Sequence, residues 1–290
     1  MEVLTFSRIK ARKNCPMAEH IRYDLELVPR NKKKSFGLGS AVHLGLETDD
    51  IDKAVGYFDG VFPDSQEEAN ELEIQRATVR AMLTGYFNRF GKWGEETIRE
   101  LSFDIPIRNP KTRAVSRSFR LQGKIDAITV IDGKPWLVEY KTASQINKGY
   151  FDRVSLDEQI TLYMYAYRET FGVKPEGVIY RVLKKPTIRQ TKKESLEQFC
   201  NRLEQDYVDR PDFYFFEQKY YRSENDLKQF EKELWAFTQQ YLYEKRNDIN
   251  CKNASRCLDF GQCEYMPICL GEADLELDYV KKEKHEELRA

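Results

Sequence analysis

The alternation of apolar and polar residues predicts helices that surround a strand-rich middle of the chain. Helical spacing of apolar residues predicts five helices, over residues 16–27, 37–60, 66–92, 155–171 and 224–246. Residues 99–142 alternate as strands do, and a further strand is expected over 176–183. The apolar stripe of the last helix indicates a packing face, and the mixture of elements indicates an α/β protein.

The most informative local pattern is that of a β-hairpin. Asp132-Gly133 separates two apolar-rich runs, and this dipeptide favours a two-residue type I′ turn because both positions need a positive φ. Counting outward from that turn puts Asp126 directly opposite Glu139. Because side chains alternate along a strand, Lys141 is expected on the same face as Glu139.

This predicted pair of carboxylates has a chemical consequence. Directly opposed residues have Cβ atoms about 5 Å apart, so Asp126 and Glu139 repel each other unless a cation lies between them or one keeps a proton. Two carboxylates and the Lys141 amine on one patch of sheet suit a divalent metal that activates water. The alternative is an ordinary solvent-facing hairpin.

The two strands of this hairpin carry a family resemblance. Gly-x-Ile-Asp ending at Asp126, followed by Glu-x-Lys over residues 139–141, resembles the core of the PD-(D/E)XK nucleases in its RecB-like form. The resemblance implies an α/β restriction-endonuclease-like core, with a mixed central sheet flanked by helices. It also implies Mg²⁺ or Mn²⁺ as the cation and adds the Tyr140 carbonyl to the ligands Asp126 and Glu139. Lys141 would orient or deprotonate the attacking water, or stabilise the developing charge.

Three further matches narrow the resemblance. His43 lies in a Gly-Ser-Ala-Val-His segment that is similar to the helical histidine motif of RecB-like nucleases, which implies an imidazole metal ligand; a lone helical histidine is otherwise commonly structural. Glu100 precedes the hairpin, where that group often has an acidic residue. Gln159 and Tyr163 form the Q-x-x-x-Y of the group, on one helix face. They would contact the nucleic acid or the lysine; the alternative is a surface glutamine beside a half-buried tyrosine.

The cysteines resemble the split set of the iron–sulfur branch, which includes the AddB nuclease domain and the CRISPR-associated adaptation exonucleases. That resemblance implies a [4Fe–4S] cluster on Cys15, Cys257, Cys263 and Cys269, which would join the two ends of the chain. The spacing departs from the pattern, because the usual C-terminal set is tighter at its start. A cluster or Zn²⁺ with Cys251 in place of Cys15, or no metal at all, stays open.

Composition bounds the domain organisation. The 290 residues suit a single nuclease domain over 1–270, with a catalytic core over about 95–185 and the Cys15 staple closing on 251–270. Residues 271–290 are highly charged, and a frayed helix or disorder is expected there. Six cysteines are too few for a disulfide scaffold, and Cys200 is expected to be a small buried apolar residue. With no apolar run of membrane-spanning length and no signal-peptide pattern, we expect a cytoplasmic protein without membrane contact.

Net charge is −1, which does not by itself indicate nucleic-acid binding, but the basic residues are segregated. The clusters are Arg8, Lys10, Arg12 and Lys13; Arg30, Lys32, Lys33 and Lys34; Arg108, Lys111, Arg113, Arg117 and Arg120; and Arg181, Lys184, Lys185, Arg189, Lys192 and Lys193. Such clusters around one acidic site could hold phosphates on both sides of it, or they could be solvated faces.

Three functions follow as hypotheses. The first is a metal-dependent deoxyribonuclease, and the resemblance implies an exonuclease on single-stranded DNA or duplex ends, in recombination, repair, phage DNA processing or CRISPR adaptation. The second is a catalytically silent nucleic-acid-binding subunit that works with a helicase or recombination protein. The third is a zinc-stabilised interaction protein with an incidental acidic hairpin.

Overall fold

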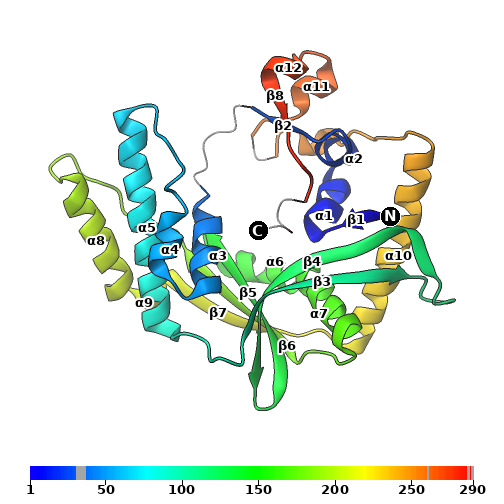
Figure 1. Cartoon of the computed structure of the whole chain (residues 1–290), viewed down its shortest axis with the longest axis horizontal. Helices are drawn as coiled ribbons and strands as arrows, with labels where there is room; N and C mark the ends of the chain where they lie inside the picture. The colour runs from blue at the N-terminus through cyan, green and yellow to red at the C-terminus, as the bar shows by residue number, and fades with distance from the viewer. Residues whose placement is uncertain (31–36, 260, 286–287, 289–290) are drawn as a thin grey trace.

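The protein has a mixed central sheet with helices on both sides (Figure 1). The computed structural model describes residues 1–30, 37–259, 261–285 and 288. Strand order is β1-β4-β5-β6-β7, with β3 paired to β4. The bounds are β1 Glu2–Leu4, β3 Ile98–Arg108, β4 Val115–Ile131, β5 Lys134–Ala143, β6 Gly177–Lys184 and β7 Phe215–Tyr220. Only β1–β4 and β5–β6 are parallel in this sheet, so the predicted α/β fold with a mixed sheet is confirmed.

The main helices form two groups (Figure 1). On one side lie α3 (Leu38–Thr48), α4 (Ile51–Gly56), α5 (Gln66–Phe90), α8 (Leu196–Asp209) and α9 (Pro211–Tyr214). On the other lie α1 (Phe6–Asn14), α7 (Glu158–Phe171) and α10 (Glu224–Arg246), and α6 (Lys148–Ser155) precedes α7. The helices predicted over 66–92 and 224–246 are therefore confirmed as α5 and α10.

The two faces of the sheet have separate cores. Leu137 and Tyr180 pack with residues of α7 and α10, while Val138 and Ile179 pack with residues of α5 and α8. A strand with both faces covered buries successive side chains, and Trp136–Tyr140 is buried throughout. A polar side chain in this part of β5 is therefore costly unless it is paired or functional, and Glu139 is the one that occurs there.

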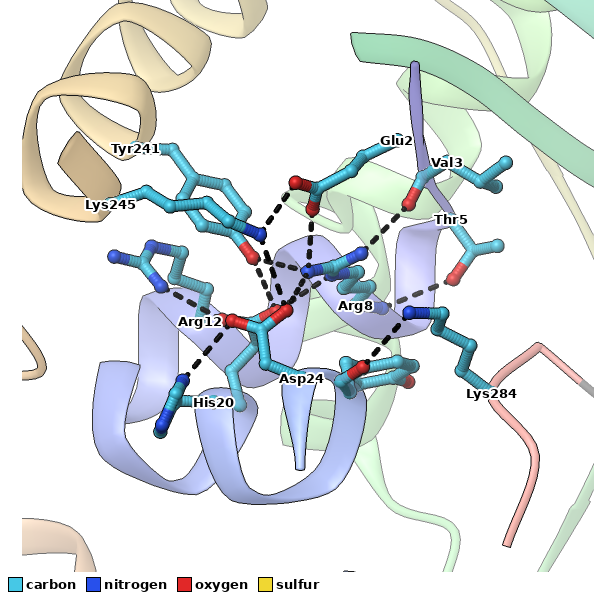
Figure 2. A network of polar contacts seen from close by, with 12 residues as sticks. Glu2, Val3, Thr5, Arg8, Arg12, His20, Asp24, Tyr241, Lys245 and Lys284 are labelled. Carbon is cyan, nitrogen blue, oxygen red and sulfur yellow. Dashed lines mark hydrogen bonds and ion pairs between the residues drawn. The ribbon is translucent and has the colours of Figure 1, made fainter. Parts of the chain in front are cut away.

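A buried ion network anchors the N-terminal segment (Figure 2). Arg8 of α1 is 1% exposed and donates to Glu19 Oε1 at 2.7 Å and to Asp24 Oδ1 at 3.0 Å. Tyr241 of α10 donates to the same Glu19 oxygen at 2.6 Å, and Arg12 donates to Glu19 Oε2 at 2.8 Å. Glu19 ends α2 (Pro16–Glu19) and Asp24 ends the π-helix η1 (His20–Asp24). The network thus ties the segment around Cys15 to the long helix α10.

The end of the chain differs from the expectation of a frayed helix or disorder. Residues 275–281 form α12 (Leu275–Asp278) and β8 (Tyr279–Lys281), and β8 pairs antiparallel with β2 (Leu27–Pro29). Tyr279 is 4% exposed and packs with Tyr265, because β2 offers both a free strand edge and an apolar surface. No helix in the described ranges is both long enough and apolar enough to cross a bilayer.

Candidate active site

The predicted hairpin is present with the expected register. Asp132 and Gly133 have φ of 51° and 73°, as a type I′ turn requires, and pairing runs from Ile131–Lys134 to Ala127–Val138. The next step outward brings Asp126 level with Glu139. The amide of Tyr140 donates to Asp126 Oδ2 at 2.8 Å, so β5 fixes the orientation of that carboxylate.

Glu139 and Lys141 lie on one face of β5, as predicted, and the lysine ammonium donates to Glu139 Oε1. The second oxygen, Oε2, is buried and accepts no hydrogen bond from any described residue. Burial, followed by the charge of Asp126, raises the pKa of Glu139 to about 7. Lys141 keeps its own pKa above the usual value because Glu139 and Asp126 outweigh its burial. This carboxylate therefore has an unsatisfied demand for positive charge.

His43 is brought to Asp126 by α3. Its Nδ1 lies 3.6 Å from Asp126 Oδ1. The helix can lie close to α5 because Gly45 has no side chain: a Cβ there would come within 2.3 Å of Leu83 Cδ1. Burial would lower the pKa of His43 and raise that of Asp126, but their mutual attraction wins, so the pKa of the imidazole is raised and that of the carboxyl is lowered.

The structure adds Glu100 to these residues. Ligand atoms of His43, Glu100 and Asp126 all lie within 4.8 Å of one another, the separation expected of residues that share one cation. Glu100 has a φ of 52° inside β3, a strained conformation for a residue with a side chain, and such strain clusters at functional sites. Its pKa is raised by burial, although Lys124 Nζ lies 2.9 Å from Oε2 and opposes that shift.

Sequence reasoning noted Glu100 but left it out of the ligand set, and strand register explains why. Near the β3–β4 connection Arg108 pairs with Val115, and that register continued unchanged would put Thr97 opposite Asp126. An irregularity between Pro106 and Arg108 shifts the pairing, so Glu100 becomes level with Asp126. The only signal in the sequence was an acidic residue ahead of the hairpin.

Gln159 and Tyr163 lie near the site on α7. Gln159 Nε2 donates to the Tyr163 hydroxyl at 3.0 Å. Burial, then the charge of Glu139, raises the pKa of Tyr163 well above its usual value, with Asp126 and Glu100 acting in the same direction. Among the described residues neither side chain has a hydrogen bond to Lys141. The predicted role of this pair at the lysine or the nucleic acid stays a prediction.

The structure brings together the cysteines of the first predicted set. Burial raises the pKa of Cys269, and the charges of Cys15, Cys263 and Cys257 add to that effect, so these thiols share one neighbourhood. Cys269 lies on α11 (Met266–Leu270), while Cys251 is exposed. All six cysteines are free thiols. Cys200 lies apart, on α8, and is only partly buried against the core of the α5 side.

Comparison with protein families gives the same assignment as the geometry. Residues 3–270 match the model of the PD-(D/E)XK nuclease superfamily. The chain belongs to the PD-(D/E)XK nuclease superfamily. The match covers every residue of the site described above and confirms the resemblance seen in the hairpin motifs.

Two solved structures are similar in fold. One is a protein named "Putative exonuclease" from Eubacterium rectale, with a TM-score of 0.55 and 13% identity, over 94% of this chain and 89% of that one. The other is SSO0001, with a TM-score of 0.34 and 12% identity, over 92% of this chain and 96% of that one. The first likeness shows a shared fold. Comparison with curated proteins gives no match.

Proposed function

We propose that this PD-(D/E)XK nuclease is a divalent-metal-dependent deoxyribonuclease that acts as an exonuclease on single-stranded DNA or duplex ends. The observation that carries the proposal is the convergence of His43, Glu100 and Asp126, all within 4.8 Å by their ligand atoms, beside Glu139 and Lys141. Every position of the family motif has the residue type that phosphodiester hydrolysis requires.

The donor set fits a divalent cation. Carboxylate oxygens suit Mg²⁺ and Mn²⁺, and an imidazole beside them favours the softer Mn²⁺. The buried Glu139 Oε2, which has no hydrogen-bond partner among the described residues, provides a further oxygen for such a cation. The Tyr140 carbonyl is the remaining proposed ligand. A cation bound there would lower the pKa of water and offset the charge of the phosphate.

The protein's own side chains then have distinct tasks. The Tyr140 amide holds Asp126 in a fixed orientation. Glu139 holds the Lys141 ammonium at the site, where the lysine would orient the attacking water or stabilise negative charge on the phosphate. Gln159 and Tyr163 form a hydrogen-bonded pair that would contact the substrate strand. No side-chain nucleophile is required.

The choice of an exonuclease rests on two likenesses: the RecB-like motifs of this chain, and the name of the Eubacterium rectale protein that shares its fold. DNA is the proposed substrate, in the cytoplasm. A helicase or recombination protein is the proposed partner that would deliver DNA ends, since a net charge of −1 provides little long-range attraction to DNA.

We further propose a [4Fe–4S] cluster on Cys15, Cys257, Cys263 and Cys269. The mutual electrostatic effect of these thiols supports this set over the set with Cys251. Tetrahedral Zn²⁺ with bonds of about 2.3 Å would hold its sulfurs about 4 Å apart. In the described chain no three cysteine sulfurs lie within 4.8 Å of one another, and this wider spacing suits a larger group.

One cleavage experiment tests the nuclease proposal. Anaerobically purified wild type and Lys141→Ala are incubated with Mn²⁺ or Mg²⁺ and with single-stranded and duplex DNA labelled at the 5′ or the 3′ end. We expect short products from wild type alone, and the label that is released first reports polarity. Cleavage by folded Lys141→Ala would contradict the mechanism. An inactive, folded, iron-replete wild type would favour the binding-subunit hypothesis.

A further inference from the structure

We propose that the segment Lys184–Lys193, here called the basic loop, is the surface that grips the phosphodiester backbone of the strand entering the active site. The inference rests on the proposed function and deepens it by assigning a substrate-binding surface. The loop contains Lys184, Lys185, Arg189, Lys192 and Lys193 and no acidic residue. It connects β6 to α8.

Sheet register places the basic loop beside the catalytic residues. β5 and β6 are parallel, and Lys141 pairs with Val182 while Ala143 pairs with Lys184. The Lys185 amide donates to the Ala143 carbonyl at 2.8 Å, which extends the pairing by one step. At about 3.3 Å per residue, the loop therefore begins only about 7 Å along the sheet from Lys141, at the same edge.

The cations of the basic loop are unpaired, in contrast to those of the other basic clusters. Within the described ranges no carboxylate lies within 4 Å of any of the five; Lys184 Nζ lies instead over the Phe213 ring, at 3.4 Å from its centre. Elsewhere the cations serve the fold. Arg8 and Arg12 belong to the buried network, Arg113 pairs with Glu231, Arg120 pairs with Asp104, and Arg181 pairs with Glu217. The Lys32–Lys34 cluster lies outside the described residues.

The backbone of the basic loop is anchored, so its charges are presented in a fixed arrangement. Glu194, the acidic residue that follows, accepts from the Thr191 amide at 3.1 Å and from Arg202 at 2.7 Å. Arg202 also donates to the Arg189 carbonyl at 3.0 Å. Ile188 is partly buried against the core of the α5 side. Arg189, Lys192 and Lys193 are left exposed, and their neighbouring acid is already occupied.

The chemistry of the loop selects the kind of ligand. Five cations without carboxylates attract a chain of phosphates, and flexible lysines bind phosphates as point charges without reading bases. The contact is therefore expected to be independent of sequence and strongly dependent on salt. Each phosphate contact on a single strand contributes about 0.7 to the slope of log affinity against log salt.

The test is a binding measurement that does not need cleavage. Wild type, the loop variant Arg189→Gln/Lys192→Gln/Lys193→Gln and a control variant are titrated against a fluorescein-labelled 20-nucleotide oligothymidylate in EDTA, at several KCl concentrations. The control, Lys228→Gln/Lys232→Gln/Arg246→Gln, removes three exposed cations of α10, on the opposite side of the molecule (Figure 1). Its net charge equals that of the loop variant. Circular dichroism confirms that all three proteins are folded.

We expect the loop variant to bind roughly 10- to 50-fold more weakly near physiological salt, with its salt slope reduced by about 2. The control is expected to change affinity less than threefold. Equal loss in both variants would overturn the basic loop as the binding surface, and so would unchanged binding by the loop variant. If wild type cleaves DNA but the loop variant binds like the control, this inference fails alone; if wild type neither binds nor cleaves, the proposed function fails with it.

Discussion

The amide nitrogen of Tyr140 lies 2.8 Å from Asp126 Oδ2, so the backbone of one hairpin strand orients the carboxylate of the other. Asp126 and Glu139 are thereby held as neighbours, with Lys141 bound to one of the two Glu139 oxygens. The remaining Glu139 oxygen, buried and without a partner among the described residues, makes this site sensitive to pH and to cations.

Stability of the metal-free protein is predicted to fall as pH rises toward neutrality because of Glu139. Its pKa is about 7 in the fold against an ordinary 4.5, so the folded state holds this proton more tightly than the unfolded state does. The contribution is full below pH 4.5 and is lost as pH rises through 7, by roughly 3 kcal/mol.

Glu139→Gln should remove this pH dependence, and added Mn²⁺ should reduce it in wild type because a cation favours the ionised carboxylate. The measurement is urea unfolding in EDTA from pH 4.5 to 8, for both proteins, with and without Mn²⁺. Parallel curves for wild type and Glu139→Gln in EDTA would show that this carboxyl does not titrate as predicted.

Glu100→Gln is predicted to weaken Mn²⁺ binding by at least about tenfold, because loss of groups that only support metal ligands already costs 10- to 100-fold. Exposed Glu96, on the loop before β3, provides the control Glu96→Gln. Isothermal titration with Mn²⁺ measures both. Unchanged affinity in Glu100→Gln would place the cation among Asp126, Glu139 and His43 alone.

Cys15→Ser is predicted to lose iron and colour, whereas Cys251→Ser keeps both. The reason is that Cys15, and not Cys251, shares the neighbourhood of Cys257, Cys263 and Cys269. Losing a link between positions more than 200 residues apart should also lower stability, on the order of 4 kcal/mol if it acts as other long-loop cross-links do.

Iron per protein, visible absorbance and melting temperature are the measurements, with Cys200→Ser as the control outside the set. Colourless Cys251→Ser beside coloured Cys15→Ser would exchange the two ligand sets. A fully stable, colourless Cys15→Ser would argue against the stapling role.

Glu19→Gln is predicted to destabilise the protein by about 3–5 kcal/mol, because Glu19 is 0% exposed and pairs with both Arg8 and Arg12. The matched change Glu158→Gln removes the half-exposed pair with Lys13 and should cost about 1 kcal/mol or less. Urea unfolding compares the two. Equal effects would mean that the buried network contributes no more than a surface pair.

How much the sequence could predict depended on how local each relationship is. Asp132-Gly133 sets the β4–β5 register by itself, because a two-residue turn leaves only one pairing, so the placement of Asp126, Glu139 and Lys141 could be counted from the chain. The long helices α5 and α10 followed from apolar spacing for the same reason.

Tertiary structure decided the rest. Glu100 reached the site through an irregularity near Pro106, and no residue pattern announces where a strand pair shifts register. The pairing of Tyr279–Lys281 with Leu27–Pro29 needs an edge strand that lies about 250 residues away, so a charged tail became a strand. Local propensity sets turns and helices, whereas contacts between distant segments form only when packing brings their surfaces together.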